Sequence, residues 1–173
     1  MSDRGVIRLN LLATDVQEVI GSSLAHLSGR IENEHKDIKL VTQIPEEMPQ
    51  IRADFDKMTQ ILNNIMDNAL NYTYAGGTIT VGAKTEGNSV VISVADTGIG
   101  IAKEKQDRIW NRFFRDEEQN LVMETSGTGL GLSIVKEYVT MHNGEIWLES
   151  ESDQGTTFYV RIPVFVTDAV AAD

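Results

Sequence analysis

The stretch SGTGLGLSIVK, residues 126–136, indicates how the rest of the chain is organised. Its glycines occupy three alternate positions, Gly127, Gly129 and Gly131, and apolar residues then recur at helical spacing. The loop therefore ends at the N-terminus of a helix, where free backbone N–H groups and the helix dipole favour anions. Residues without side chains let a polyphosphate approach this backbone closely.

A plainer interpretation of the same loop stays open, because glycines before a helix are often only a flexible joint. The loop is not a P-loop, since no Gly-Lys-Ser/Thr closes it. It is not a dinucleotide fingerprint either, since polar residues rather than a strand precede it. Alone, the loop indicates an anion site without identifying the ligand.

The composition limits the classes of protein to consider. A length of 173 residues fits one domain, residues 1–173, with a sizeable core, and 41% hydrophobic residues are typical of a globular protein. No run approaches the length of a membrane span, and nothing resembles a signal peptide. The absence of cysteine excludes disulfides and is compatible with a reducing cytoplasm. A net charge of −11 argues against a nucleic-acid surface, so local devices must hold any phosphate ligand.

Hydrophobic periodicity and turn residues predict an α+β fold. The first predicted element is a short strand or extended segment at 7–11, and a helix opened by a Thr14/Gln17 capping box then reaches about residue 34. Strands follow at 38–44 and 51–53, a helix at 55–72, and strands at 78–84 and 89–95. The last predicted elements are a helical segment at 103–110, a helix at about 129–141 ended by a left-handed Gly144, and strands at 145–150 and 156–164. Hairpins with separated helices predict a two-layer α/β sandwich: one mixed, mostly antiparallel sheet covered on one face by three main helices, with an ordered core over about 7–164.

The helix predicted over residues 55–72 carries an unusual flank. Its apolar residues form one stripe, and Asn64, Asn68 and Asn71 fall together away from that stripe. Asparagine is a poor helix former, so three on one face cost helix stability unless they serve a purpose there. The alternative is an ordinary solvated polar face, which is the rule for helix flanks.

The buried strand predicted at 89–95 runs into DTGIGI, residues 96–101. Asp96 offers a fixed hydrogen-bond acceptor at the end of the strand, and Gly98 and Gly100 leave open backbone beside it. This arrangement suits recognition of a base that carries an amino group. The alternative is an Asx turn whose glycines supply positive φ angles.

Aromatic residues and arginines alternate in IWNRFFR, residues 109–115. The aromatics can fix one end of a mobile segment while Arg112 and Arg115 reach phosphate oxygens, although arginines on a polar loop are more often merely solvated. Residues 116–126 are polar and acidic. We therefore predict a lid over about 111–128 that becomes ordered around a ligand.

Four motifs now stand in one order: NIMDNALNYT, DTGIGI, IWNRFFR and GTGLGL. Together they resemble the N, G1, F and G2 boxes of the catalytic ATP-binding domain of sensor histidine kinases, in the superfamily shared with gyrase, heat-shock chaperones and mismatch-repair ATPases. The resemblance covers nearly the whole chain. It implies that the chain binds ATP with Mg²⁺ and transfers the γ-phosphoryl group to a histidine in two-component signal transduction.

The resemblance also implies residue roles. Asn68 is the expected magnesium ligand, and Asn64, Arg112 and Arg115 are the expected catalytic residues near the phosphates. Asp96 is the expected acceptor of the adenine amino group. The other expected nucleotide contacts are Tyr72 beside the nucleoside, Gly98, Gly100 and Ile101 along the base, Thr128, Gly129, Leu130 and Gly131 at the phosphates, and Thr157 at the adenine.

The chain departs from the family pattern in two places. Position 71 is asparagine where the family commonly has lysine, so one expected phosphate cation is missing. No phosphoacceptor pattern of the His-Glu-Leu-Arg type follows His26, His35 or His142. We therefore expect a separate dimerisation and phosphoacceptor domain to supply the substrate histidine. A response regulator is expected downstream, with no nucleic-acid or membrane contact by this domain, and a cytoplasmic position whether or not the parent kinase is anchored in a membrane.

One position bears on the reaction type. ATPases of the superfamily place a glutamate on this helix to activate water, whereas this chain has Asn64, which cannot take up a proton at neutral pH. Phosphoryl transfer is therefore favoured over hydrolysis. The alternatives are a nucleotide-sensing module without catalysis, a serine kinase of the anti-sigma type and a hydrolytic ATPase.

Overall fold

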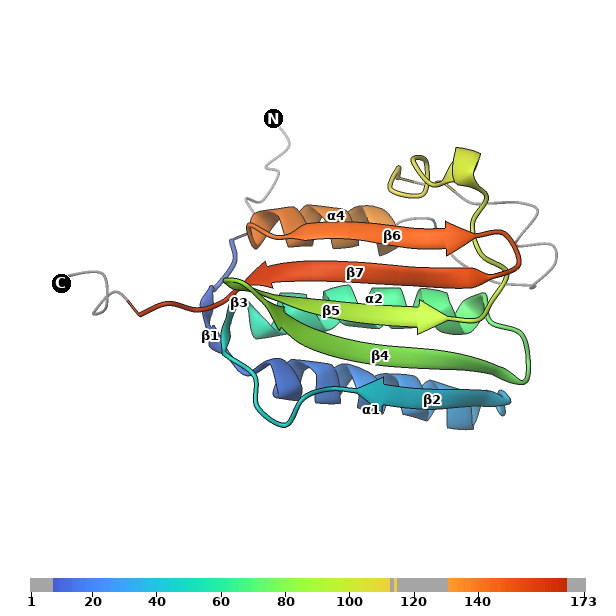
Figure 1. Cartoon of the computed structure of the whole chain (residues 1–173), viewed down its shortest axis with the longest axis horizontal. Coiled ribbons are helices and arrows are strands. Elements are labelled where there is room, and N and C mark those ends of the chain that lie inside the picture. Colours follow the sequence, from blue (N-terminus) through green and yellow to red (C-terminus); the bar gives the residue numbers. More distant parts are fainter. Residues whose placement is uncertain (1–7, 113, 115–130, 168–173) are drawn as a thin grey trace, which may run out of the picture.

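The computed structural model describes residues 8–112, 114 and 131–167 as two layers, a sheet and a set of helices on one of its faces (Figure 1). The sheet has the strand order β2 (Ile38–Gln43), β4 (Gly77–Glu86), β5 (Ser89–Asp96), β7 (Gly155–Pro163) and β6 (Glu145–Glu151). β2 and β4 are parallel and the other neighbours are antiparallel, so the sheet is mixed and mostly antiparallel. The predicted fold class is confirmed.

Among the described residues, three helices cover this face: α1 (Val16–Asn33), α2 (Phe55–Asn71) and α4 (Gly131–Met141). α2 lies between the other two and contacts both. Its apolar residues from Met58 to Leu70 are buried in one core cluster with Ile92 in β5 and Phe158 in β7. The core therefore lies between α2 and the middle of the sheet. Within the described residues, no helix combines the length and apolar character needed to cross a lipid bilayer.

The predicted start of the chain was wrong in two respects. Within the described residues the first strand is β1 (Leu12–Thr14), not residues 8–11 of the predicted segment. β1 forms a small antiparallel sheet with β3 (Ile51–Ala53). The Thr14 hydroxyl donates to the carbonyl oxygen of Ala53 at 2.9 Å instead of capping a helix. Asp15 caps α1, because its carboxylate accepts hydrogen bonds from two backbone N–H groups of the first turn.

Two further local predictions were wrong. Residues 103–110 form only a short 3₁₀ turn, η1 (Lys103–Lys105), followed by further turns. After α4 the left-handed residue is Asn143, with φ 57°, rather than Gly144. Asparagine tolerates this conformation, whereas Gly144 is needed for close packing, since a Cβ there would lie 2.3 Å from the carbonyl oxygen of Arg161.

Candidate functional site

Asp96 ends β5 on the helix-covered face of the sheet. Its Oδ1 accepts hydrogen bonds from the backbone N–H groups of Gly98, at 2.9 Å, and Thr156, at 3.3 Å. Burial raises the pKa of Asp96 to about 6, although the two N–H donors act in the opposite direction. Its Oδ2 makes no hydrogen bond to another described residue. Near neutral pH the site therefore presents a half-buried carboxylate with one uncommitted acceptor oxygen.

The loop after Asp96 packs against the end of α2. Ile99 N donates to the carbonyl oxygen of Tyr72 at 3.1 Å, and a Cβ on Gly98 would lie 2.0 Å from that same oxygen. Gly100 has φ +69°, and a Cβ there would lie 2.0 Å from the carbonyl oxygen of Glu151. The Asx turn that we considered as an alternative is present, but close backbone contacts also require these glycines.

The N-terminus of α4 lies against the middle of α2 and brings two predicted site residues together. A Cβ built on Gly131, the first residue of α4, would lie 3.9 Å from Oδ1 of Asn64 on α2. Asn68 lies one turn further along the same helix and is likewise half-buried. Asn64 and Asn68 make no side-chain hydrogen bond to a partner among residues 8–112, 114 and 131–167. This flank of α2 therefore keeps neutral carboxamides available beside the N-terminus of α4.

The remaining residues predicted at the phosphates either lie on the surface or lie outside the described residues. Arg112 is exposed, and its Nη2 lies 3.9 Å from a carboxylate oxygen of Glu137 on α4. Arg115 and the residues predicted at the phosphates before α4, Thr128, Gly129 and Leu130, lie outside the described residues. The same holds for most of the predicted lid at 111–128, so that prediction stays untested.

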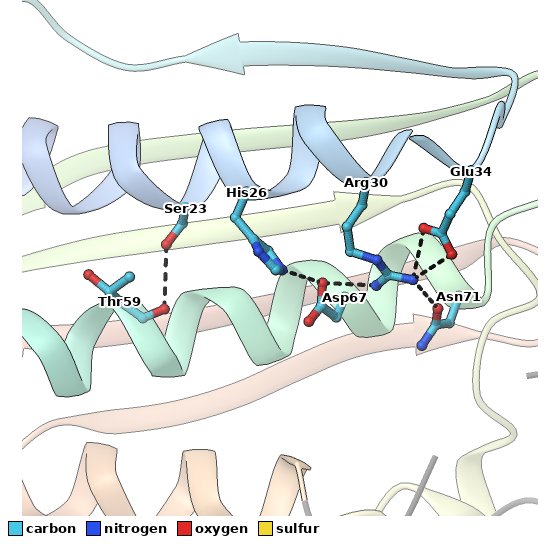
Figure 2. A network of polar contacts seen from close by, with 7 residues as sticks. All are labelled: Ser23, His26, Arg30, Glu34, Thr59, Asp67 and Asn71. Atoms are coloured by element: carbon cyan, nitrogen blue, oxygen red, sulfur yellow. Dashed lines mark hydrogen bonds and ion pairs between the residues drawn. The ribbon is translucent and has the colours of Figure 1, made fainter. Parts of the chain in front are cut away.

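Asn71 does not share the surroundings of Asn64. Figure 2 shows that Arg30 of α1 reaches Asp67 and Asn71 of α2, with Nη1 2.9 Å from Asp67 Oδ1 and Nη2 donating to Asn71 Oδ1 at 3.3 Å. His26 Nε2 lies 2.9 Å from the same Asp67 oxygen, and Arg30 also pairs with Glu34. Asn71 therefore belongs to the charged seam between α1 and α2, which explains a polar, uncharged residue beside an arginine.

The strand β7 places Thr156 rather than Thr157 beside Asp96. Thr156 pairs with Asp96 across the strands and donates its N–H to that carboxylate, whereas Thr157 pairs with Ala95. Because Phe158 faces the core, strand alternation puts Thr156 on the helix-covered face and Thr157 on the opposite face. Thr156 is therefore the threonine next to the Asp96 carboxylate, and the same period of two in the sequence could have identified it. The adenine contact expected of Thr157 stays a prediction.

A shallow pocket of about 330 Å³ adjoins the end of the sheet where Asp96 lies. It is lined by Asp96, Glu149, Ser150, Glu151, Gln154, Gly155, Thr156 and Thr157. The sequence did not indicate Ser150 as a site residue, because nothing in its local sequence distinguishes it from other serines in strands.

A buried histidine links the C-terminus of α4 to the N-terminus of α2. His142 Nδ1 lies 2.7 Å from the carbonyl oxygen of Tyr138, and its Nε2 accepts from the backbone N–H of Asp54, the N-cap of α2, at 3.2 Å. A carbonyl only accepts hydrogen bonds, so the ring proton sits on Nδ1 and the imidazole is neutral. His142 thus links α4 to α2 and is not a surface histidine open to modification.

Comparisons with known proteins agree with this geometry. Residues 53–165 match the family described as histidine kinase-, DNA gyrase B-, and HSP90-like ATPase. The chain is 39% identical over 130 residues to the adaptive-response sensory kinase SasA of Rippkaea orientalis, which covers 75% of this chain and 32% of that protein. It is 38% identical over 128 residues to the sensor histidine kinase WalK of Bacillus subtilis, which covers 73% and 21%. The chain thus spans a third or less of the length of these two relatives.

Solved structures give the same result. The nucleotide-free catalytic domain of histidine kinase ThkA is similar with a TM-score of 0.77 and 27% identity, covering 90% of this chain and 97% of that one. Full-length ShkA in complex with AMPPNP is similar with a TM-score of 0.78 and 29% identity, covering 94% and 33%. Because the family match spans more than half of the sequence, the chain belongs to the histidine kinase-, DNA gyrase B- and HSP90-like ATPase family.

Proposed function

We propose that this chain binds ATP with Mg²⁺ and transfers the γ-phosphoryl group to a histidine on a separate dimerisation and phosphoacceptor domain. The observation that carries the proposal is the placement of two groups along α2. The Asp96 carboxylate lies by Tyr72 at one end, and the Asn64–Gly131 contact lies eight residues earlier, about 12 Å along the helix axis. This separation suits a nucleoside triphosphate whose base lies at Asp96 and whose phosphates lie at the start of α4.

The phosphate end fits a magnesium ion held mainly by the substrate. Within the described residues, no group of three or more His, Asp or Glu side chains is placed to hold a metal. The carboxamide oxygen of Asn68 is a hard, neutral donor, and Mg²⁺ commonly takes its other ligands from phosphate oxygens and water. When bound, Mg²⁺ would neutralise charge on the transferring phosphoryl group.

Asn64 favours transfer over hydrolysis in this proposal. A carboxamide cannot accept a proton from water at neutral pH, so the described part of α2 supplies no general base for water attack at this position. A histidine imidazole is itself a nucleophile: its nitrogen forms a bond to the γ-phosphorus, the bond to the bridging oxygen breaks, and ADP leaves. The site then needs only to position the phosphate and stabilise its charge. A response regulator would accept the phosphate next, in the cytoplasm.

The base contact is tested by replacing Asp96 with asparagine. The variant should bind Mg-ATP more weakly by about 1–3 kcal/mol, because a carboxamide can present a donor where the adenine amino group needs an acceptor. Isothermal titration calorimetry measures the dissociation constants. The control is Asp56→Asn, an exposed carboxylate in the first turn of α2, which should keep wild-type affinity. Equal ATP affinity of Asp96→Asn and wild type would refute the base contact.

The reaction is tested by adding radiolabelled Mg-ATP and a purified histidine kinase dimerisation domain. Label should appear on that domain and be lost in acid, because phosphohistidine is acid-labile. Acid-stable label would indicate a serine kinase instead. ATP binding without any transfer would indicate a nucleotide-sensing module, and steady phosphate release without an acceptor would indicate a hydrolytic ATPase.

A further inference from the structure

Ser150, near the end of β6, makes three hydrogen bonds with its hydroxyl group. Its Oγ accepts from the backbone N–H of Ile101 at 2.8 Å and lies 2.9 Å from the carbonyl oxygen of Gly155. It also lies 2.8 Å from the hydroxyl oxygen of Thr156, the residue that donates its N–H to Asp96. Ser150 therefore connects the loop after Asp96, the β6–β7 turn and the β7 threonine beside Asp96.

The chemistry of these partners assigns the protons. A serine hydroxyl has one hydrogen, and the Gly155 carbonyl can only accept, so the Ser150 hydrogen points to Gly155. The contact between the two hydroxyls must then use the hydrogen of Thr156. Thr156 is buried, with 6% of its surface exposed, and its hydroxyl is left with lone pairs only.

A second side chain fixes this arrangement. The Gln106 side-chain amide donates to the carbonyl oxygens of Ile101, at 3.0 Å, and Ser150, at 3.1 Å. These bonds involve the backbone of Ser150 and not its hydroxyl. Loss of the Ser150 hydroxyl therefore removes the constraint on Thr156 while the surrounding segments stay tied together.

We infer that Ser150 is a positioning residue that makes the Thr156 hydroxyl an acceptor-only group beside Asp96, and that these two acceptors together select 6-amino over 6-oxo purine nucleotides. The inference rests on the proposed function, since it assumes that a purine lies at Asp96. An amino group donates hydrogen bonds to both acceptors. A 6-oxo group presents its lone pairs to the lone pairs of these acceptors, which is costly.

The inference predicts a change in selectivity when Ser150 is replaced by alanine. Without its fixed partner, the Thr156 hydroxyl can rotate and donate to a 6-oxo group. The ratio of the Mg-ITP to the Mg-ATP dissociation constant should fall by about three- to tenfold, the worth of one hydrogen bond. Calorimetry with both nucleotides measures this ratio. Ser150→Thr retains the hydroxyl and should restore the wild-type ratio.

The control is Ser93→Ala, which removes a serine hydroxyl from the opposite face of β5, where Ser93 pairs with Tyr159, and it should keep the wild-type ratio. A folded Ser150→Ala protein with the wild-type ratio would overturn the inference. If that variant fails to fold, Thr156→Val and Thr156→Ser test the same inference. The valine variant should lose selectivity for ATP over ITP, and the serine variant should keep it. An unchanged ratio in the valine variant would overturn the inference. Wild-type protein that binds neither nucleotide would refute the proposed function itself.

Discussion

The two flanks of α2 are built from different chemistry. Toward α1, polar and charged side chains pair across the seam: Arg30 and His26 both contact Asp67, as Figure 2 shows. Toward α4, the side chain at the contact is the neutral carboxamide of Asn64, facing a glycine. The first flank pairs its charged groups with side chains of α1, whereas the second keeps neutral polar groups available for a ligand.

The difference has an electrostatic consequence. Asp67 is the residue before Asn68, so an unpaired carboxylate there would repel a bound triphosphate. Its ion pair with Arg30 offsets that charge on the side away from α4. In a chain with a net charge of −11, this pairing lets an anion approach a helix that carries a carboxylate close to Asn68, the proposed magnesium ligand.

The largest expected effect follows from removing a carboxamide on the open flank. Asn68→Ala should lower the affinity for Mg²⁺ in the presence of ATP by at least about tenfold, since even loss of an outer-shell partner of a metal ligand costs that much. ATP affinity measured without divalent cation should change little. A magnesium titration of ATP binding measures both. Asn33→Ala, at the exposed end of α1, is the matched control, and a wild-type titration curve for Asn68→Ala would remove Asn68 from the metal site.

The next effect is a pH dependence at the base end. Asp96 has a pKa of about 6 because it is buried, so protonation below that pH converts its acceptor oxygen into a donor. ATP affinity should therefore be nearly complete above about pH 7, be half lost near pH 6 and fall about tenfold between pH 7 and pH 5. Calorimetry at several pH values measures the change. Asp96→Asn is the control, because any pH dependence that it retains belongs to ATP or to other groups.

Stability without nucleotide should respond to pH in the opposite direction. The pKa of Asp96 is raised in the folded protein from an ordinary value of 3.8, so the folded state binds more protons than the unfolded state between these values. The contribution of Asp96 to stability is therefore present below pH 4 and lost as the pH rises through 6. Comparing the urea midpoints of wild type and Asp96→Asn across this pH range isolates the contribution of Asp96. If the two midpoints changed with pH in parallel, the raised pKa of Asp96 would be contradicted.

The sequence predicted α2 within one residue at its end, because a strong apolar stripe follows the Asp54 cap. It also placed Asp96 at the end of a strand. It failed where the answer depends on distant partners: helical spacing grouped Asn71 with Asn64, but Arg30, forty-one residues away, binds Asn71 toward α1. Strand alternation could have favoured Thr156 over Thr157, whereas the role of Ser150 depends on three segments that meet only in the folded chain.

A smaller effect is expected on the charged flank. Asp67→Ala should lower the free energy of unfolding by about 1 kcal/mol, the upper range for partly exposed ion pairs, because Arg30 and His26 lose a shared partner. Affinity for Mg-ATP should stay within about twofold of wild type, since the seam toward α4 is untouched. Urea denaturation and calorimetry measure the two quantities.

The double variant Arg30→Met with Asp67→Ala tests whether the loss comes from this pair. If the pair is responsible, the second substitution should add less than its effect alone, because its partner is already absent. Loss of ATP binding in Asp67→Ala with unchanged stability would mean that Asp67 serves the ligand, and the comparison of the two flanks would then fail.

The smallest effect is expected at Asn71, which lies at the boundary between the flanks. Asn71→Lys should reduce stability by less than about 0.5 kcal/mol, because the new ammonium group replaces the acceptor of Arg30 with a like charge in a partly solvated position. The lysine side chain can also turn away from Arg30 toward the flank of α2 that faces α4, where its positive charge would attract phosphate. Mg-ATP affinity should therefore rise about two- to fivefold, and this gain should become smaller at high salt. Denaturation and calorimetry at two ionic strengths measure both changes. Because repulsion from Arg30 and attraction to phosphate act on one ammonium group, a stability loss with no gain in affinity would place position 71 wholly within the charged seam.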